Sequence, residues 1–285
     1  MVYNLKEFDN QTIKAFAPAE KVGLVASVNP EGLPHITLIT SIGAAGPKQV
    51  ILGEFCKGDS KIHIQKNPKI GFLVMSMDRK MWRGHAKWTH FRQEGPEYEV
   101  YNDQPMFRYN AYFGINTVHY LDLIDARGPD GLPLASIILS SLMTKIAKGG
   151  AATGKNERIL NVFSEDLFNR LDALKFIAYI RDNGYPELVP LLQCQAADSR
   201  LLAFSTMAYG DELSQIPAGK DVAIFGMTMK MEDVMVRGTF KGASRSRGIQ
   251  TGTVDIDWVY NSMPPAHGQI YPPVKLVPVT EFSDF

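Results

Sequence analysis

The chain has few cysteines, no excess of either charge and no long apolar run. Only Cys56 and Cys194 occur among its 285 residues, and 30 Lys and Arg balance 30 Asp and Glu. The two cysteines fall in different halves, so no paired-cysteine metal site is expected. Zero formal net charge predicts no general attraction to nucleic acid or to an anionic membrane. No stretch of about 20 residues is apolar enough to cross a bilayer.

The same composition favours a soluble globular protein. Hydrophobic residues make up 45% of the chain and charged residues 21%, and the length suits about two domains. Residues 1–7 are too polar for a signal peptide. We therefore expect a cytoplasmic protein with reduced thiols.

An internal repeat is the strongest signal in the sequence. Four pieces of the first half recur in the same order in the second: 26–34 with 178–186, Gly58-Asp59 with Gly210-Asp211, Arg83-Gly84 with Arg237-Gly238, and 117–122 with 253–258. Gly184 follows Gly32 by 152 residues, and the last pair of pieces is 136 residues apart. Solenoid repeats are much shorter, roughly 20 to 50 residues. The pattern predicts two homologous domains in one chain.

Each copy reads as a helix followed by short strands. The helices are expected over 11–20 and over 165–174, the second capped by Ser164. Gly32 and Gly184 close polar four-residue stretches that are typical of hairpin turns. The strands expected are 22–28, 35–42, 49–54, 70–75, 81–88 and 118–124, then 176–180, 187–192, 200–205, 222–229, 234–240 and 253–260. Such a sheet protects its edges by closing, so a mainly β, α+β fold with two small barrels is predicted.

Two segments break the repeat. Leu134, Ile138, Leu142 and Ile146 recur every four residues, which predicts an amphipathic helix, and residues 149–154 are typical of a flexible linker. The domains expected are therefore 1–130 and 161–285, with a helix and Gly-rich linker at 131–160. The first copy also carries an aromatic insertion near 96–113, with Tyr98, Tyr101, Phe107, Tyr109, Tyr112 and Phe113. It is expected either to wall a pocket or to pack on the barrel as a lid or dimer contact.

A phosphate site is predicted at the start of a short helix in the first copy. Gly58 suits a turn, Asp59 suits an N-cap and Asn67-Pro68 ends the helix, so Ser60 and Lys61 fall in its first turn. Free backbone N–H groups, a hydroxyl and an ammonium together suit an anion. A solvated surface turn would have the same sequence. The second copy has Glu212 and Leu213 at these positions, and its carboxylates would repel a phosphate.

These residues resemble the pyridoxamine 5'-phosphate oxidase-like FMN-binding split barrels. The resemblance runs through residues 32–40, Asp59-Ser60-Lys61, Asn67-Pro68 with the strand at 69–74, and residues 83–87. It covers most of residues 20–125, with a weaker echo over 165–262. The order and spacing of the pieces carry it, since no single piece is specific.

The resemblance implies a six-stranded split barrel that works as a dimer, with FMN held in the cleft between two barrels. The strand with His35, Thr37 and Thr40 would lie along the flavin, although the oxidase itself usually begins this strand with a basic residue. Ser60 and Lys61 would hold the phosphate. Arg79 and Lys80 would approach the ring system or the ribityl chain. The oxidase's C-terminal substrate signature is not recognisable, which argues against pyridoxamine phosphate as the substrate.

A fused chain of this kind would supply both barrels itself, as an intramolecular pseudo-dimer with one active cleft and a degenerate second barrel. Trp258 is then a candidate to cover the flavin ring across the interface, or with Tyr260 it is an edge or core aromatic of the last strand. The function expected is an FMN-dependent oxidoreductase acting on a small molecule, with NAD(P)H as a candidate electron donor and no catalytic side chain identified. A flavin or haem carrier and a scaffold with decayed sites are the alternatives. Fused chains could also pair as a homodimer.

Overall fold

The computed structural model describes residues 4–54, 58–103, 115–152, 158–261 and 268–273. The first half contains α1 (Asn10–Phe16), β1 (Lys21–Val28), β2 (Pro34–Leu38), β3 (Gly43–Gly46), β4 (Gln49–Glu54), α2 (Asp59–Lys66), β5 (Lys69–Ser76), β6 (Lys80–Arg92), α3 (Pro96–Asp103) and β7 (Thr117–Gly131). Helix α5 (Leu134–Ala151) follows. The second half contains α6 (Val162–Asn169), β8 (Leu174–Ile180), β9 (Pro186–Pro190), β10 (Gln195–Ala196), β11 (Leu201–Ser205), α7 (Gly210–Leu213), β12 (Asp221–Met227), β13 (Asp233–Ser246), β14 (Ile249–Asn261) and β15 (Gly268–Tyr271).

The two halves have the same strand order. The first sheet runs β2-β1-β5-β6-β7-β4-β3, and the second runs β9-β8-β12-β13-β14-β11-β10, with β15 added on β14. Counted within its own half, each strand of one sheet has the same neighbours as its counterpart in the other. All the ladders are antiparallel, so short hairpin connections suffice.

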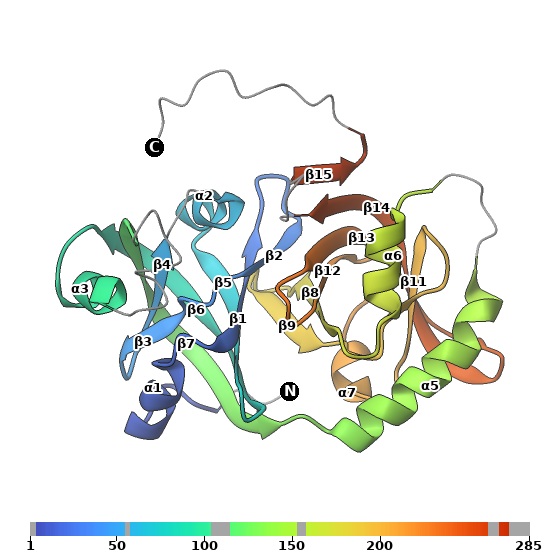
Figure 1. Ribbon diagram of the computed structural model, residues 1–285, viewed down its shortest axis with the longest axis horizontal. Coiled ribbons are helices and arrows are strands. Elements are labelled where there is room, and N and C mark those ends of the chain that lie inside the picture. The colour runs from blue at the N-terminus through green and yellow to red at the C-terminus, as the bar shows by residue number, and fades with distance from the viewer. Residues whose placement is uncertain (1–3, 55–57, 104–114, 153–157, 262–267, 274–285) are drawn as a thin grey trace.

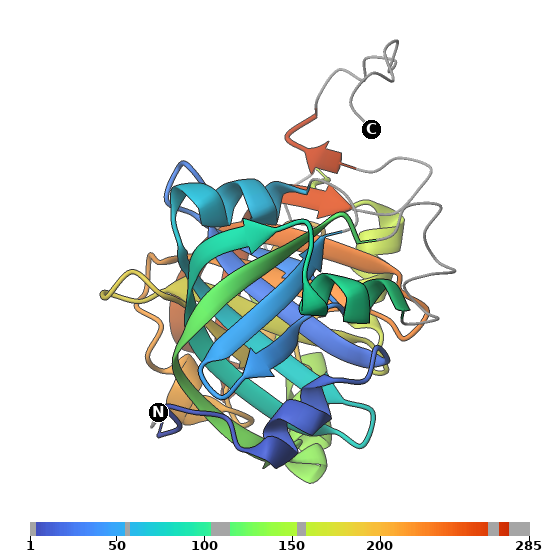
Figure 2. The same cartoon turned by 90° about the vertical axis from the view of Figure 1, so that its left-hand side faces the viewer.

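Each sheet closes on itself, because its two edge strands are consecutive in the chain. Only residues 39–42 separate β2 from β3, and only 191–194 separate β9 from β10. Within the first of these corners, the Ile39 N–H donates to the carbonyl of Gly23 at 2.7 Å. Closure leaves few exposed edges, and Figure 2 shows the strands of the first half wrapped into a barrel. The predicted fold class is confirmed, and the short β3 and β10 add a seventh strand to each sheet.

The turn predictions hold, whereas two helix caps differ from expectation. Gly32 and Gly184 have φ of 80° and 81°, the left-handed conformation that favours glycine in these hairpins. Helix α6 is capped by the side chain of Asn161, which accepts the Ser164 N–H at 2.8 Å, and not by Ser164. Helix α2 is capped at Gly58, and Asp59 lies inside its first turn.

Three apolar clusters hold the fold together. One fills each barrel, and the third lies between the barrels, where the faces of β1, β2 and β5 meet those of β8, β9, β12 and β13 (Figure 1). This interface cluster contains Val22, Leu24, Ala26, Ile36, Leu73, Met75 and Met81 from the first half, and Phe176, Ala178, Leu188, Ala223, Phe225, Met227 and Met235 from the second. Because these side chains are buried as deeply as those inside the barrels, the halves form an intramolecular pseudo-dimer.

Helix α5 differs from its sequence pattern in the face that it buries. The stripe Leu134, Ile138, Leu142 and Ile146 is exposed, with Ile138 at 61%. The buried face instead carries Ile137, Ser140, Ser141, Thr144 and Ala147. Its hydroxyls bond the end of β11: the Ser205 N–H donates to Thr144 Oγ1 at 2.8 Å, and Ser140 Oγ donates to the Ser205 carbonyl at 3.2 Å. Gly149 and Gly150, expected in a linker, belong to this helix.

The described part of the aromatic insertion packs on the first barrel. Tyr101 of α3 is buried and its hydroxyl donates to the Ser41 carbonyl. Tyr120 of β7 donates to Glu97 at 2.9 Å and joins the same cluster. Phe107, Tyr109, Tyr112 and Phe113 lie outside the described residues. None of the helices in the described ranges is long and apolar enough to span a membrane.

Candidate functional site

The first candidate site is the region around the start of α2, at one end of the interface between the barrels (Figure 1), and we call this region the first cleft. The backbone turns into the helix at Gly58, which permits a close approach, and the helix ends at Asn67-Pro68. Ser60 is 1% exposed and Lys61 9% exposed, so both are turned into the protein. A Cβ placed on Gly58 would lie 3.9 Å from Lys61 Nζ, which puts the ammonium back over the first turn of the helix.

Two neutral histidines lie beside this helix. His35 of β2 meets His63 of α2 with ring centroids 5.0 Å apart, and His63 Nδ1 lies 3.2 Å from the buried Ser27 hydroxyl. Burial lowers the pKa of His35 to about 3, helped by the nearby His63 and Arg237. Burial also lowers the pKa of His63, although Asp59 acts in the opposite direction. At neutral pH both imidazoles are uncharged, so they can serve as hydrogen-bonding groups.

The second half contributes the opposite wall of this cleft. Arg237 of β13 stacks on Trp258 of β14, its guanidinium carbon 3.9 Å from the ring centroid. Trp258 stacks in turn on Tyr260, and Tyr260 faces His35 with centroids 6.4 Å apart. The positive charge of Arg237 contributes to lowering the pKa of both His35 and His63. The carboxylate of Asp59 acts to raise the pKa of Arg237, although burial lowers it overall. Through this aromatic pair and the contact of β13 with β2, Arg237 belongs to the same region as His35.

Three buried polar atoms around this cleft have no hydrogen-bond partner among the described residues. They are Ser60 Oγ, Thr37 Oγ1 and Arg237 Nε. Thr37 lies two residues beyond His35 on β2, and therefore on the same face of that strand. Buried polar groups are normally satisfied, because leaving one unpaired costs about 1–3 kcal/mol. The cleft thus carries unused hydrogen-bonding capacity next to a guanidinium and an ammonium.

The structure brings together most, but not all, of the residues predicted for the site. His35, Thr37, Ser60, Lys61 and Trp258 come from β2, α2 and β14 around this cleft, and Thr40 lies at the half-buried corner that follows β2. Arg79 and Lys80 do not join them. They are exposed in the turn between β5 and β6, separated from α2 by the whole length of β5, roughly 25 Å. Lys80 pairs there with Asp78 at 2.9 Å.

The second cleft has the same architecture and a different chemistry. Helix α7 lies at the other end of the interface (Figure 1), and its Glu212 occupies the position of Ser60 in the repeat. Arg83 of β6 donates to both oxygens of Glu212, at 2.6 Å and 2.9 Å, and Arg127 of β7 donates to Oε1 at 2.9 Å. Burial opposes ionisation, but the two arginines outweigh it and lower the pKa of Glu212. The expectation that Glu212 merely repels a phosphate is incomplete, because the carboxylate is itself bound by cations.

The position of His35 is also altered in this second cleft. Its counterpart is Glu187, which is fully buried. His85 bridges the two halves: its Nδ1 lies 2.7 Å from Asp125, and its Nε2 lies 3.2 Å from Glu187. Burial lowers the pKa of His85, but the hydrogen bonds and charges of these carboxylates raise it overall. Arg181 reaches Glu187 at 3.4 Å.

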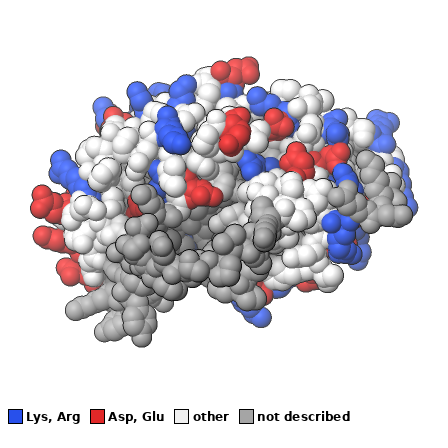
Figure 3. Space-filling model, turned by 90° about the horizontal axis from the view of Figure 1, so that it is seen from above, with Lys and Arg blue, Asp and Glu red and all other residues white. Residues whose placement is uncertain are grey.

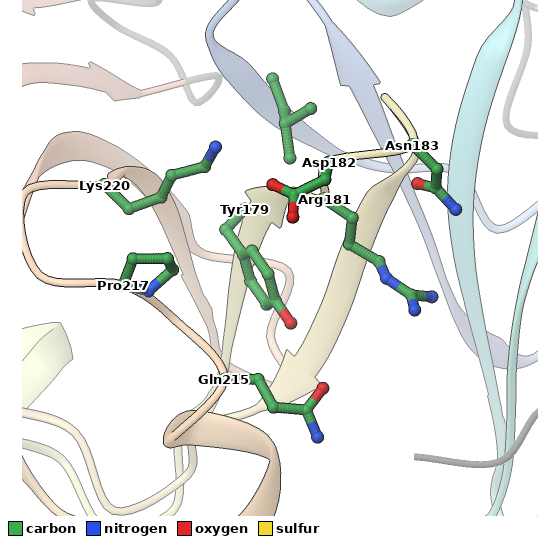
Figure 4. A pocket seen from close by; sticks show the side chains of 8 residues that line it. Tyr179, Arg181, Asp182, Asn183, Gln215, Pro217 and Lys220 are labelled. Atoms are coloured by element: carbon green, nitrogen blue, oxygen red, sulfur yellow. The ribbon is translucent and has the colours of Figure 1, made fainter.

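A pocket of about 360 Å³ opens beside this second cleft (Figure 4). Tyr179 and Gln215 line it at the positions that Ser27 and His63 hold in the first half. Figure 4 shows Pro217 and Lys220 on one side of the pocket and Arg181, Asp182 and Asn183 on the other. Its charged groups are of both signs, so it carries no strong preference for an anion.

Sequence reasoning missed two residues of the first cleft, Arg237 and His63. Arg237 was visible only as part of the repeated Arg-Gly pair. The glycine has a structural cause: a Cβ on Gly84 or Gly238 would come within 2.3 Å or 2.1 Å of a carbonyl on the neighbouring strand. The arginine before it points into a cleft in both halves. The repeat therefore contained the signal, but not the partner of each arginine.

Charges on the surrounding surface are mixed. Viewed from the side that carries α2 and β15, acidic and basic side chains alternate over the described part of the surface (Figure 3). The described part of this mixed surface offers no continuous basic face for a large polyanion (Figure 3).

Comparisons with known proteins give similarity in structure only. No protein-family model matches the chain, and a search of curated proteins gives no match. An FMN-binding protein from Syntrophomonas wolfei subsp. wolfei is 13% identical with a TM-score of 0.36, over 42% of this chain and 85% of that one. HupZ of Group A Streptococcus is 20% identical with a TM-score of 0.35, over 44% and 97%. An F420 reductase is 14% identical with a TM-score of 0.34, over 42% and 98%.

The strand order of this chain carries more weight than these low scores. Both sheets have the same strand order, and the two barrels pack over one apolar interface, with α2 and α7 near its two ends (Figure 1). The chain therefore consists of two split barrels with one strand order that pack as an intramolecular pair.

Proposed function

We propose that the first cleft binds FMN and that the protein is an FMN-dependent oxidoreductase acting on a small molecule. The unpartnered Ser60 Oγ, Thr37 Oγ1 and Arg237 Nε carry this proposal, because these buried atoms lie around the first turn of α2, where Lys61 and Arg237 supply positive charge beside the carboxylate of Asp59. Each can donate a hydrogen bond, and a phosphate offers three acceptor oxygens. The residues present therefore fit the phosphate of FMN.

The remaining groups of the cleft suit the rest of the cofactor. Trp258 and Tyr260 form a stacked aromatic pair at its second-half wall, with centroids 5.6 Å apart. Aromatic faces of this kind pack well against a planar ring system. FMN, when bound, supplies hydride or electron transfer. The protein would orient it, exclude water and offer neutral hydrogen-bonding groups at His35 and His63.

Titration of the purified protein with FMN tests the proposal directly. Flavin fluorescence should be quenched to saturation at one FMN per chain, with a shifted visible absorption spectrum. Anaerobic addition of NADH or NADPH should then bleach the bound flavin if a nicotinamide is the electron donor. A protein that neither retains nor titrates FMN would contradict flavin binding, whereas bound flavin that no donor reduces would argue for a carrier.

A haem carrier is the second candidate, because the two imidazoles in the cleft are neutral at pH 7 and neutral imidazole is the form that ligates iron. Titration with haemin distinguishes it. A Soret band that saturates at one equivalent and disappears in His35→Ala and His63→Ala would favour haem. If haemin gives no saturable Soret band, the haem proposal is wrong and the flavin proposal is the one that stands.

A further inference from the structure

We propose that Arg83 and Arg127 form an anion-binding site in the second cleft, and that the carboxylate of Glu212 is its resident ligand. The geometry is that of ligand binding: one guanidinium grips both carboxylate oxygens and a second one grips Oε1. Arg83 is 1% exposed, and its Nη1 also donates to the Leu188 carbonyl at 3.1 Å. A buried guanidinium requires a permanent counter-charge, and the chain supplies it from α7.

In the first cleft, the position equivalent to Glu212 carries no carboxylate, so the two clefts can be compared with and without this internal ligand. Arg237 corresponds to Arg83 in the repeat, and Ser60 corresponds to Glu212. Where Glu212 binds the guanidinium of Arg83, the shorter Ser60 leaves its own hydroxyl without a hydrogen-bond partner in the described part of the chain. The second cleft thus has a carboxylate at the position where the first has only a short hydroxyl side chain.

The ligand class follows from the donors. Two guanidinium groups select a small oxyanion such as inorganic phosphate or the phosphate of a monoester. Glu212 excludes that anion by occupying its place on the two guanidinium groups. Given the function proposed above, the same contact limits the chain to one flavin.

Replacing Glu212 with the residue found in the first cleft tests the inference without any flavin. The variant Glu212→Ser should be destabilised in chloride buffer and restored by inorganic phosphate at constant ionic strength. Saturating phosphate should raise its melting temperature by roughly 5 °C or more, because a ligand that binds only the folded state stabilises it by mass action. The wild-type melting temperature should move by less than about 1 °C over the same series.

Two controls separate a specific site from a general salt effect. Glu212→Gln keeps the length of the side chain and fills the site, so phosphate should not restore it. Glu212→Ser combined with Arg127→Ala retains the space but loses a cation, and the phosphate response should fall at least about tenfold in midpoint concentration, equal to about 1.4 kcal/mol.

The phosphate experiment on Glu212→Ser tests the anion site independently of FMN binding. If Glu212→Ser folds only when phosphate is present during refolding, the inference is supported, and equal failure to refold in phosphate and in chloride counts against it. If phosphate stabilises Glu212→Ser no more than it stabilises the wild type, the site does not exist. A phosphate response in a protein that never binds FMN would uphold this inference and overturn the other.

Discussion

The two clefts have the same strand order around them and different charged groups within them. In the second, Arg83 and Arg127 are neutralised by Glu212, and a histidine bridges two carboxylates. In the first, Arg237 and Lys61 lie beside neutral histidines and three unpartnered polar atoms. The comparison shows that one repeated arginine can serve stability in one place and ligand binding in the other. Which role it takes depends on the side chains that face it, above all on whether Glu212 or Ser60 occupies the start of the helix.

Removing the repeated arginine should have the largest effect, and only in the second cleft. Arg83→Ala leaves Glu212 buried with one cation fewer, and we expect a loss of about 3 kcal/mol in the free energy of unfolding. Arg237→Ala loses its stacking on Trp258, worth about 1 kcal/mol or less. Urea unfolding of both variants measures the difference. If both variants lost the same free energy of unfolding, Arg83 could not be distinguished from Arg237 as the structural arginine.

Reversing the charge at Lys61 should abolish FMN retention. Lys61→Glu places a carboxylate where the phosphate is proposed to bind, and we expect affinity to fall by at least about 100-fold, or about 2.7 kcal/mol. Lys80→Glu is the matched control, since Lys80 is exposed at the far end of β5 and should not affect binding. Fluorescence titration with FMN measures the affinity of both variants. A loss of affinity in Lys80→Glu would restore the original expectation for that residue.

The two clefts should respond to pH with opposite signs. The pKa of His35 is lowered from 6.5 to about 3 in the folded protein, so the unfolded chain takes up a proton that the folded cleft excludes. Stability from His35 is therefore present above pH 6.5 and lost as the pH falls toward 3. The pKa of His85 is raised above 6.5, so its contribution is present below that pH and lost as the pH rises through the raised value.

Urea unfolding between pH 5 and 9 checks both signs. His35→Gln should flatten the acid side of the stability profile, and His85→Gln should flatten the alkaline side. If either variant flattens the other side, the assigned protonation state of that histidine is wrong.

The smallest effect should come from the unpartnered hydroxyl. Ser60→Ala removes a buried polar atom that lacks a partner, so the free energy of unfolding should change by less than about 1 kcal/mol. FMN affinity should fall by roughly five- to tenfold, as expected for one hydrogen bond. A large destabilisation with unchanged affinity would show that Ser60 is a structural residue.

Local patterns predicted the elements well. The hairpin glycines, the end of α2 at Asn67-Pro68 and β4 at Gln49–Glu54 all follow from short-range backbone preferences. The face that α5 buries could not be predicted from its apolar stripe. Ser140 and Thr144 face the barrel because β11 offers backbone groups there, and only the assembled sheet reveals them.

The residues of the candidate site also fall into those that local sequence indicates and those that only the tertiary structure reveals. The sequence pointed to Ser60 and Lys61 as candidates, because a helix start with a hydroxyl and an ammonium is a local feature, and their role in binding stays a prediction. It misplaced Arg79 and Lys80, because the distance between a turn and a helix depends on the direction of the strand between them. It did not identify Arg237, because that arginine reaches α2 across the interface between the halves.

By itself, the sequence determined the repeat, the strand-rich architecture and the asymmetry between Ser60 and Glu212, since each is written in the order of residues along the chain. The tertiary structure decided which arginine meets which of these side chains. Arg83 and Glu212 are 129 residues apart and come together only when two closed barrels pack face to face. Burial at that interface then makes every charge there require a partner, either from the chain itself or from a ligand.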